Sequence, residues 1–159
     1  MHVNDAVISP EGGETVMNLG TLVRIKVAST DTNGAFSVVE HVVPPNAGPP
    51  LHTHPETEVL YVLEGEFDVG IGTERTRASR GAVVHVRPHT PHSTKNVGST
   101  AGRLLSVYLP GAADRFFVEA GAPVAPGDNL PNFDHPADMS SVDVPHVLAI
   151  AKRHGMQIV

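Results

Sequence analysis

Apolar and polar residues alternate over several short stretches of the chain. In residues 21–29, Val23, Ile25 and Val27 alternate with charged side chains, and residues 66–72 repeat the pattern. This period of two is typical of a strand with one buried face. Further short strands, separated by Gly, Ser, Pro and Thr, are predicted at 36–43, 74–78, 82–86, 92–96 and 103–109. The pattern predicts an all-β domain with many turns.

One run is apolar at every position rather than at every second one. Residues 59–63 read Val-Leu-Tyr-Val-Leu, so both faces of the predicted strand are hydrophobic. A strand of this kind is covered on both sides. The domain's own core covers one side, and a helix or a second subunit is needed for the other. We therefore expect a homodimer.

The last third of the chain changes from strand to helix patterns. Residues 112–121 predict a short helix anchored by Phe116 and Phe117. A second helix is predicted within residues 140–155, with Asp143 as its N-terminal cap. The expected fold is thus a β domain followed by short C-terminal helices.

Length and composition exclude several classes of protein. With 159 residues, 40 % of them hydrophobic, the chain fits one domain. The net charge of −6 and the absence of a basic stripe argue against binding to nucleic acid. No apolar run approaches the ~20 residues that span a bilayer. The chain has no cysteine, and its first residues lack the features of a signal peptide, so we expect a cytoplasmic protein.

Candidate chemistry comes from the histidines, of which there are ten. His52 and His54 are two residues apart and share one face of a strand. Glu58 has the same parity if the strand is regular. Each of these groups is costly to bury alone, and a metal ion would satisfy all three. Their spacing therefore predicts a metal site.

A second segment supplies a fourth candidate ligand. It begins at Gly81, continues through a Val-rich strand, turns between Pro88 and Pro91, and reaches His92 at the start of the next strand. Together, the two segments resemble the two motifs of the cupin family over about residues 35–110. The matching residues are His52, His54, Glu58 and Gly65 in the first motif, and Gly81, Pro88, His92 and Asn96 in the second. Two positions depart from the pattern: Gly48 is unusually close to His52, and His89 replaces a glycine.

The resemblance implies an all-β, antiparallel double-stranded β-helix, that is, a jelly-roll cupin barrel. Residues 1–159 would form a single cupin domain, with the barrel at about 15–110 and a helical extension at about 111–159. His52, His54, Glu58 and His92 would hold one divalent transition metal per chain. Fe, Mn, Ni, Co, Cu and Zn all remain candidates, because histidine and carboxylate ligands suit each of them.

The segment 111–123, GAADRFFVEAGAP, is similar to the corresponding part of quercetin dioxygenase-like cupins. This implies a dioxygenase-type oxidoreductase acting on a small hydroxylated aromatic or enolisable substrate. Glu58 would be the catalytic proton acceptor, with a pKa raised by the apolar barrel. Two alternatives stay open: a redox-neutral isomerase, cyclase or decarboxylase that uses the same metal, and a cupin that binds a small molecule without catalysis.

Other polar residues have simpler interpretations. Glu56 shares the parity of Glu58 but lacks its six-residue spacing to Gly65, so we interpret it as an exposed loop residue. His85 either donates a hydrogen bond in the pocket or is a hydrogen-bonded strand residue, and His89 either lies at the pocket mouth or faces solvent. The remaining candidates for solvated histidines are His2, His135, His146 and His154.

Overall fold

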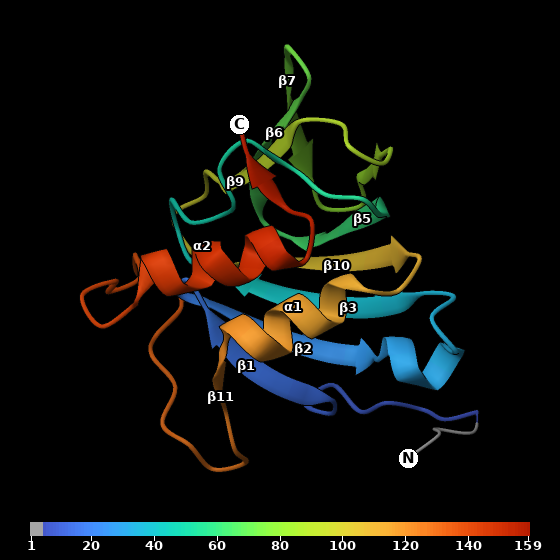
Figure 1. Ribbon diagram of the computed structural model, residues 1–159. Helices are drawn as coiled ribbons and strands as arrows, with labels where there is room; N and C mark the ends of the chain where they lie inside the picture. Colours follow the sequence, from blue (N-terminus) through green and yellow to red (C-terminus); the bar gives the residue numbers. More distant parts are fainter. Residues whose placement is uncertain (1–4) are drawn as a thin grey trace.

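The alternating segments form two antiparallel sheets that face each other, as Figure 1 shows for the computed structural model, which describes residues 5–159. The larger sheet has the strand order β11 (Ala122–Pro123), β1 (Glu14–Asn18), β2 (Thr21–Val27), β3 (Ser37–Val43), β10 (Gly102–Leu109), β5 (Thr57–Glu64) and β8 (Val83–Val86). The smaller sheet has the order β12 (Gln157–Ile158), β4 (His52–Thr53), β9 (His92–Asn96), β6 (Glu66–Ile71) and β7 (Glu74–Ser79). The all-β jelly roll with short C-terminal helices is confirmed.

Half of the larger sheet is covered by the smaller one. Strands β10, β5 and β8 face the smaller sheet across a core in which Val62 and Phe67 are fully buried. Along β5, every second residue points into this core, including Leu60. Burying one such side chain contributes about 1.5–3 kcal/mol. The predicted inward faces of 21–29 and 66–72 are confirmed by the burial of Val23 and Val69.

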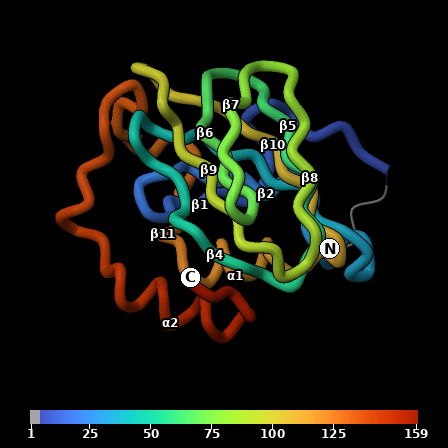
Figure 2. The backbone as a smooth tube through the Cα atoms, turned by 90° about the horizontal axis from the view of Figure 1, so that it is seen from above, coloured from blue at the N-terminus to red at the C-terminus, as the bar shows by residue number. Residues whose placement is uncertain are grey.

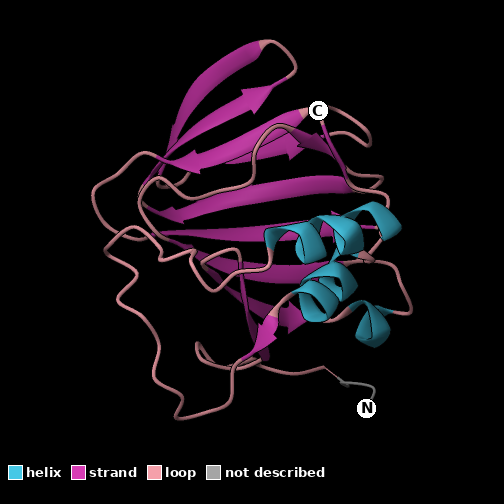
Figure 3. Ribbon diagram, turned by 60° about the vertical axis from the view of Figure 1, so that its left-hand side comes forward, coloured by secondary structure: helices cyan, strands magenta, loops and turns pink. Residues whose placement is uncertain are grey.

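The other half of the larger sheet is covered by helices. Helix α1 (Ala113–Ala120) packs on β1 and β3, and α2 (Val144–Arg153) packs on α1 (Figure 3). Phe116 is buried between the two helices, which confirms its anchoring role. The Asp143 side chain accepts the His146 N–H at 3.0 Å, as predicted for the cap. Within residues 5–159, no helix is long and apolar enough to cross a membrane.

Motif residues that are not candidate ligands hold turns in place. Gly65 has a φ of 91°, which favours glycine, and it links β5 to β6. Asn96 is fully buried. Its Nδ2 donates to the carbonyls of Val43 and Thr100 at 2.8 and 2.9 Å, so it ties the end of β9 to two neighbouring segments.

The C-terminal residues add an edge strand that the sequence pattern did not predict. Strand β12 pairs with β4, and Ile158 lies opposite His52. The Val159 N–H donates to the Leu51 carbonyl at 3.0 Å. Figure 2 shows the C-terminus beside β4. Strands of two residues have no periodicity to detect, which also explains why β11 was not predicted, and the short 3-10 helix η1 (Ser29–Thr32) is a single turn without a pattern of its own.

Candidate metal centre

Three separate segments carry the predicted ligands to one end of the barrel. His52 lies in β4, directly opposite His92 at the start of β9. His54 follows two residues after His52, and Glu58 lies in β5 of the other sheet. The site is therefore built where the two sheets approach each other.

The three histidines converge. Their candidate ligand atoms all lie within 4.8 Å of one another. His54 and His92 are 2 % and 3 % exposed, whereas His52 is half-buried. The His52 and His92 ring centroids are 4.2 Å apart. The pairing of β4 with β9 brings His92 beside His52, which lies 40 residues earlier in the chain.

Each imidazole is held in the same way, through its Nδ1 atom. The partners are backbone carbonyl oxygens: Pro50 at 2.8 Å from His52, Glu56 at 3.1 Å from His54, and Thr90 at 2.8 Å from His92. A carbonyl only accepts, so Nδ1 carries the proton in all three rings. In a neutral ring, Nε2 then keeps its lone pair, which is the form that binds a metal.

Glu58 faces two of these Nε2 atoms. Its Oε2 is 3.3 Å from His54 Nε2 and 3.4 Å from His92 Nε2. Its Oε1 accepts a hydrogen bond from the Ser106 hydroxyl at 2.8 Å. The buried His92 Nε2 has no hydrogen-bond partner among residues 5–159. A carboxylate oxygen facing nitrogen lone pairs requires a cation between them, so this donor set fits a metal ion.

The pKa values of His54 and His52 indicate which imidazole is protonated when no metal is bound. Burial alone would lower the pKa of His54, but Glu56 and Glu58 outweigh it and raise that pKa to about 9. Burial, together with the neighbouring His92, lowers the pKa of His52 to about 4. Without a metal, a second proton on His54 therefore balances Glu58. Binding a cation at this site has to displace that proton.

The expected rise in the pKa of Glu58 is wrong. Burial does act in that direction, but the close contacts with His54 and His92 override it and hold the pKa well below its usual range. The expected rise followed from the apolar barrel around Glu58 and left out the effect of the neighbouring imidazoles on its pKa. Glu58 is therefore a carboxylate at neutral pH.

The expectation for Glu56 is also wrong. It was interpreted as an exposed loop residue, but it is only 3 % exposed. The turn after His54 directs its side chain inward, and its Oε2 lies 3.4 Å from His54 Nδ1. The parity of Glu56 with Glu58 indicates an inward side chain, whereas the six-residue spacing to Gly65 favours Glu58 alone as a ligand.

The other histidines do not join the cluster. His85 and His89 are exposed, so neither is one of its candidate ligands. His135 and His146 are exposed as predicted, whereas the half-buried His154 contacts Glu119 at 2.7 Å and is not simply solvated. His2 lies outside the described residues.

Sequence analysis missed two residues that line the site. Ser106 and Tyr108 point inward from β10 and are 0 % and 5 % exposed. The Tyr108 ring centroid is 5.9 Å from that of His54. Burial raises the pKa of Tyr108 well above its usual range, and the Glu58 charge adds to this effect, so its hydroxyl is neutral. Alternation in residues 103–109 could have identified both as inward polar side chains.

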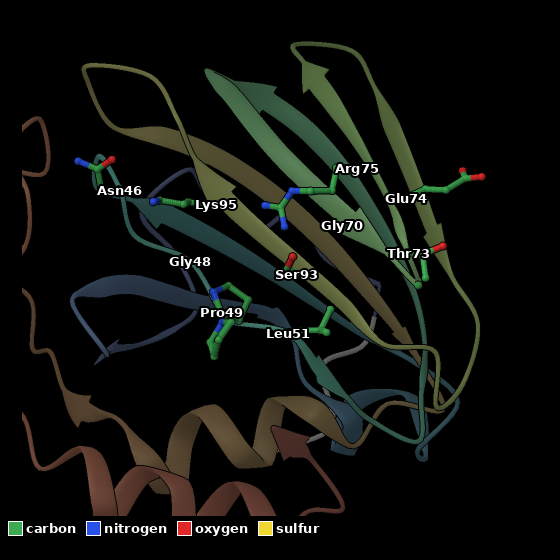
Figure 4. Close-up of a pocket in the computed structure, with 12 residues that line it drawn as sticks. Asn46, Gly48, Pro49, Leu51, Gly70, Thr73, Glu74, Arg75, Ser93 and Lys95 are labelled. Carbon is green, nitrogen blue, oxygen red and sulfur yellow. The ribbon is translucent and has the colours of Figure 1, made fainter. Parts of the chain in front are cut away.

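Two hollows lie outside the cluster. A cleft of about 270 Å³ opens between β7 and β8, with Val69, Ile71 and Val84 among its lining residues. A shallower groove of about 450 Å³ crosses the outer face of the smaller sheet near Ser93 and Lys95 (Figure 4). The predicted ligands line neither hollow. The cleft, however, enters between the edges of the two sheets, on the side of the apolar core.

Comparison with known families agrees with this geometry. Residues 39–108 match the family model of the cupin domain. The barrel therefore resembles the cupin domain over this range. The matched range contains all four candidate ligands, and it begins in β3 and ends in β10.

Related cupins come from several organisms. An uncharacterised protein of Methanocaldococcus jannaschii is 29 % identical over 75 residues, which is 46 % of this chain and 60 % of that protein. Quercetin 2,3-dioxygenase of Bacillus subtilis is 29 % identical over 118 residues, which is 74 % of this chain and 35 % of the dioxygenase. The chain thus spans less than two thirds of either relative.

Solved structures show the same fold. An RmlC-like cupin from Shewanella frigidimarina superimposes with a TM-score of 0.62 at 23 % identity. The match covers 72 % of this chain and 99 % of that structure. The chain therefore resembles the cupin family and, within it, the quercetin dioxygenase-like cupins. Three of its histidines lie where they could hold a metal ion.

Proposed function

We propose that this cupin is a mononuclear metal-dependent enzyme of the dioxygenase type, acting on a small hydroxylated aromatic or enolisable substrate. The observation that carries the proposal is the set of three imidazoles whose Nδ1 atoms face backbone carbonyls, which leaves three Nε2 atoms directed at one point. Similarity to quercetin 2,3-dioxygenase supports the reaction class.

His52, His54, His92 and Glu58 would hold one divalent transition metal per chain. When bound, such an ion supplies Lewis acidity that stabilises a substrate oxygen anion, and a redox-active ion also supports reaction with dioxygen. Three imidazoles and one carboxylate leave room for a substrate oxygen on a five- or six-coordinate ion.

The protein's own groups have distinct tasks around this substrate. Glu58 is ionised and would accept the substrate proton when it loosens from the metal, while the Ser106 hydroxyl holds Oε1 at 2.8 Å. The buried side chains of Leu60, Val84 and Val86 exclude water from the reacting groups. The substrate enters through the cleft between β7 and β8.

The deciding experiment is elemental analysis of the untagged protein beside the His52→Ala variant. We expect about one transition-metal ion per chain in the parent and a large loss in the variant. Oxygen consumption with phenolic and enolic compounds then tests the reaction class. Turnover without oxygen, with Zn or Ni bound, would indicate a redox-neutral isomerase, cyclase or decarboxylase instead. Ligand binding without metal or turnover would indicate a binding protein.

We also propose a homodimer formed through the outer face of the larger sheet. Half-exposed or exposed apolar side chains lie side by side on neighbouring strands: Val59, Tyr61, Leu63, Val83, Leu105 and Val107. Tyr61 and Val83 face each other in register and are 41 % and 63 % exposed. An antiparallel sheet normally presents polar residues on a solvent face. Sedimentation of the parent and of a Tyr61→Lys, Val83→Lys double variant tests this, with a dimer and a monomer expected respectively.

A further inference from the structure

Glu56 is a buried carboxylate with an unusual environment. Its side chain is inside the barrel end, and its Oε2 has no hydrogen-bond partner among residues 5–159. This Oε2 atom lies 3.4 Å from His54 Nδ1. Burying a carboxylate in this way is unfavourable for folding, so the position calls for another explanation.

Asp114 is a buried acid that stabilises the fold through hydrogen bonds to another element. One of its oxygens, Oδ2, accepts both the backbone N–H and the hydroxyl of Ser29, at 2.8 and 3.0 Å. These two bonds tie α1 to η1. Glu56 has no comparable tie between elements in the described part of the chain. Its side chain faces only the back of one candidate ligand.

His54 differs from the other two imidazoles in this respect. The Nδ1 atoms of His52 and His92 each face one backbone carbonyl, whereas His54 Nδ1 faces both the carbonyl and the carboxylate of Glu56. A carboxylate behind a metal-binding imidazole fixes the ring and makes the opposite nitrogen a stronger donor.

We propose that Glu56 is a positioning residue of the metal centre, acting on the ion through His54. The inference rests on the proposed metal-dependent function. The net charge of the metal centre is a second reason to assign this role to Glu56. A divalent ion held by three neutral imidazoles and Glu58 keeps one net positive charge in the barrel, and the Glu56 carboxylate reduces that charge to zero.

The test compares Glu56→Gln with the parent and with Glu64→Gln, a control at the exposed end of β5. The amide keeps the size of the side chain and removes its charge. Co²⁺ and Zn²⁺ are used as probes, with dissociation constants obtained by competition with a chelator. We expect Glu56→Gln to weaken binding of both ions by about 10- to 100-fold. Glu64→Gln should bind as the parent does.

Two further readouts separate positioning from a structural role. The melting temperature of the metal-free Glu56→Gln protein should fall little, because Glu56 makes no hydrogen bond to another element in the described residues and loses only its contact with His54. The visible absorption of bound Co²⁺ should shift, because one ligand donates less strongly. If Glu56→Gln does not fold, Glu56→Asp carries the test, since the shorter carboxylate should also weaken binding.

The outcomes distinguish this inference from the proposed function. If the parent binds neither ion, the metal-dependent function fails. If the parent binds and Glu56→Gln binds equally well with an unchanged Co²⁺ spectrum, only the role of Glu56 is wrong. A lower metal-free melting temperature with unchanged affinity would likewise overturn it, because Glu56 would then only stabilise the fold.

Discussion

Two buried carboxylates on opposite faces of the larger sheet have opposite surroundings. Glu40 in β3 is 3 % exposed and lies on the outer face, whereas Glu58 in β5 is 6 % exposed and lies in the barrel. Both strands pair with β10. The two side chains therefore share a scaffold, and the comparison isolates what surrounds each carboxylate.

Glu40 is neutralised by cations of the chain itself. Its Oε1 accepts from Arg103 Nη2 and Nε at 2.6 and 3.1 Å, and Lys26 Nζ lies 3.4 Å from Oε2. Arg24 lies 3.8 Å from Oε1. Burial raises the pKa of Glu40, but these cations, Arg103 first, outweigh it and hold the pKa below its usual value.

Glu58 faces imidazoles instead of permanent cations. Each imidazole carries its Nδ1 proton toward a carbonyl, so the side facing the cluster is a lone pair unless a second proton or a metal is present. A carboxylate paired within the chain contributes to folding. A carboxylate that faces the lone pairs of imidazole nitrogens contributes to binding a metal ion. This contrast predicts that the same substitution has different consequences at the two positions.

The largest effect is expected for Glu58→Gln on metal affinity. Loss of the negative ligand should weaken binding of a divalent ion by about 100-fold or more, above the range for groups that only support a ligand. The metal-free protein should also lose some stability at neutral pH, because the lowered pKa of Glu58 means that its charge favours the folded state, so metal affinity is the readout that separates this variant from Glu40→Gln. Competition with a chelator measures the affinity, and chemical denaturation measures the stability. Unchanged affinity would remove Glu58 from the ligand set.

Removing the metal should have the next largest effect. A ligand present at 100 times its dissociation constant stabilises the folded state by about 2.7 kcal/mol. Chelation should therefore lower the melting temperature of the parent and of Glu40→Gln by similar amounts, and that of Glu58→Gln much less. Calorimetry with and without chelator provides the measurement. Equal shifts of the melting temperature in all three proteins would contradict the expected difference between Glu40 and Glu58.

Glu40→Gln should lower stability without changing metal affinity. Losing a buried carboxylate that accepts charged hydrogen bonds costs about 1.5–3 kcal/mol. Because the Arg103 side chain is 42 % exposed, solvent reduces this cost, and we expect a value near the lower limit. Urea denaturation of the metal-free proteins tests it. A change in metal affinity would show that the two faces of the sheet are coupled.

Acid should reduce the difference between the parent and Glu40→Gln. The pKa of Glu40 is lower in the folded protein than its ordinary value of about 4.5. Its contribution is therefore complete above that pH and is lost as the pH falls through the lower, folded value. Denaturation of both metal-free proteins over a pH series should show their stabilities converging on acidification. A constant difference would mean that the Glu40 charge is not the stabilising feature.

The smallest effect is expected for Ser106→Ala. The variant removes one hydrogen bond to a charged carboxylate, so Glu58 loses its Oε1 partner. We expect metal-free stability to fall by no more than about 1.5 kcal/mol, with a several-fold loss of metal affinity, below that of Glu58→Gln. Denaturation and chelator competition report both quantities. An affinity equal to that of the parent would indicate that Glu58 is oriented by the metal alone.

Local patterns predicted the strands that carry the site. Alternation identified β2, β3 and β6, and the parity of His52, His54 and Glu58 placed three polar groups on one side. Parity also contained the information for Ser106 and Glu56, but it does not say which inward positions approach each other. The direction of the Glu58 pKa shift depended on His54 and on His92 of β9, and no local pattern includes the second of these neighbours.

The sequence by itself determined the all-β class, the inward and outward faces of the longer strands, and the set of residues able to bind a metal. These properties depend on periodicity and side-chain chemistry, which are local. Only the tertiary structure decided that β4 pairs with β9, that β12 supports the His52 strand, and that Glu56 lies buried behind His54. Such features depend on pairing between distant segments, where the register of one strand sets the neighbours of every side chain on the next.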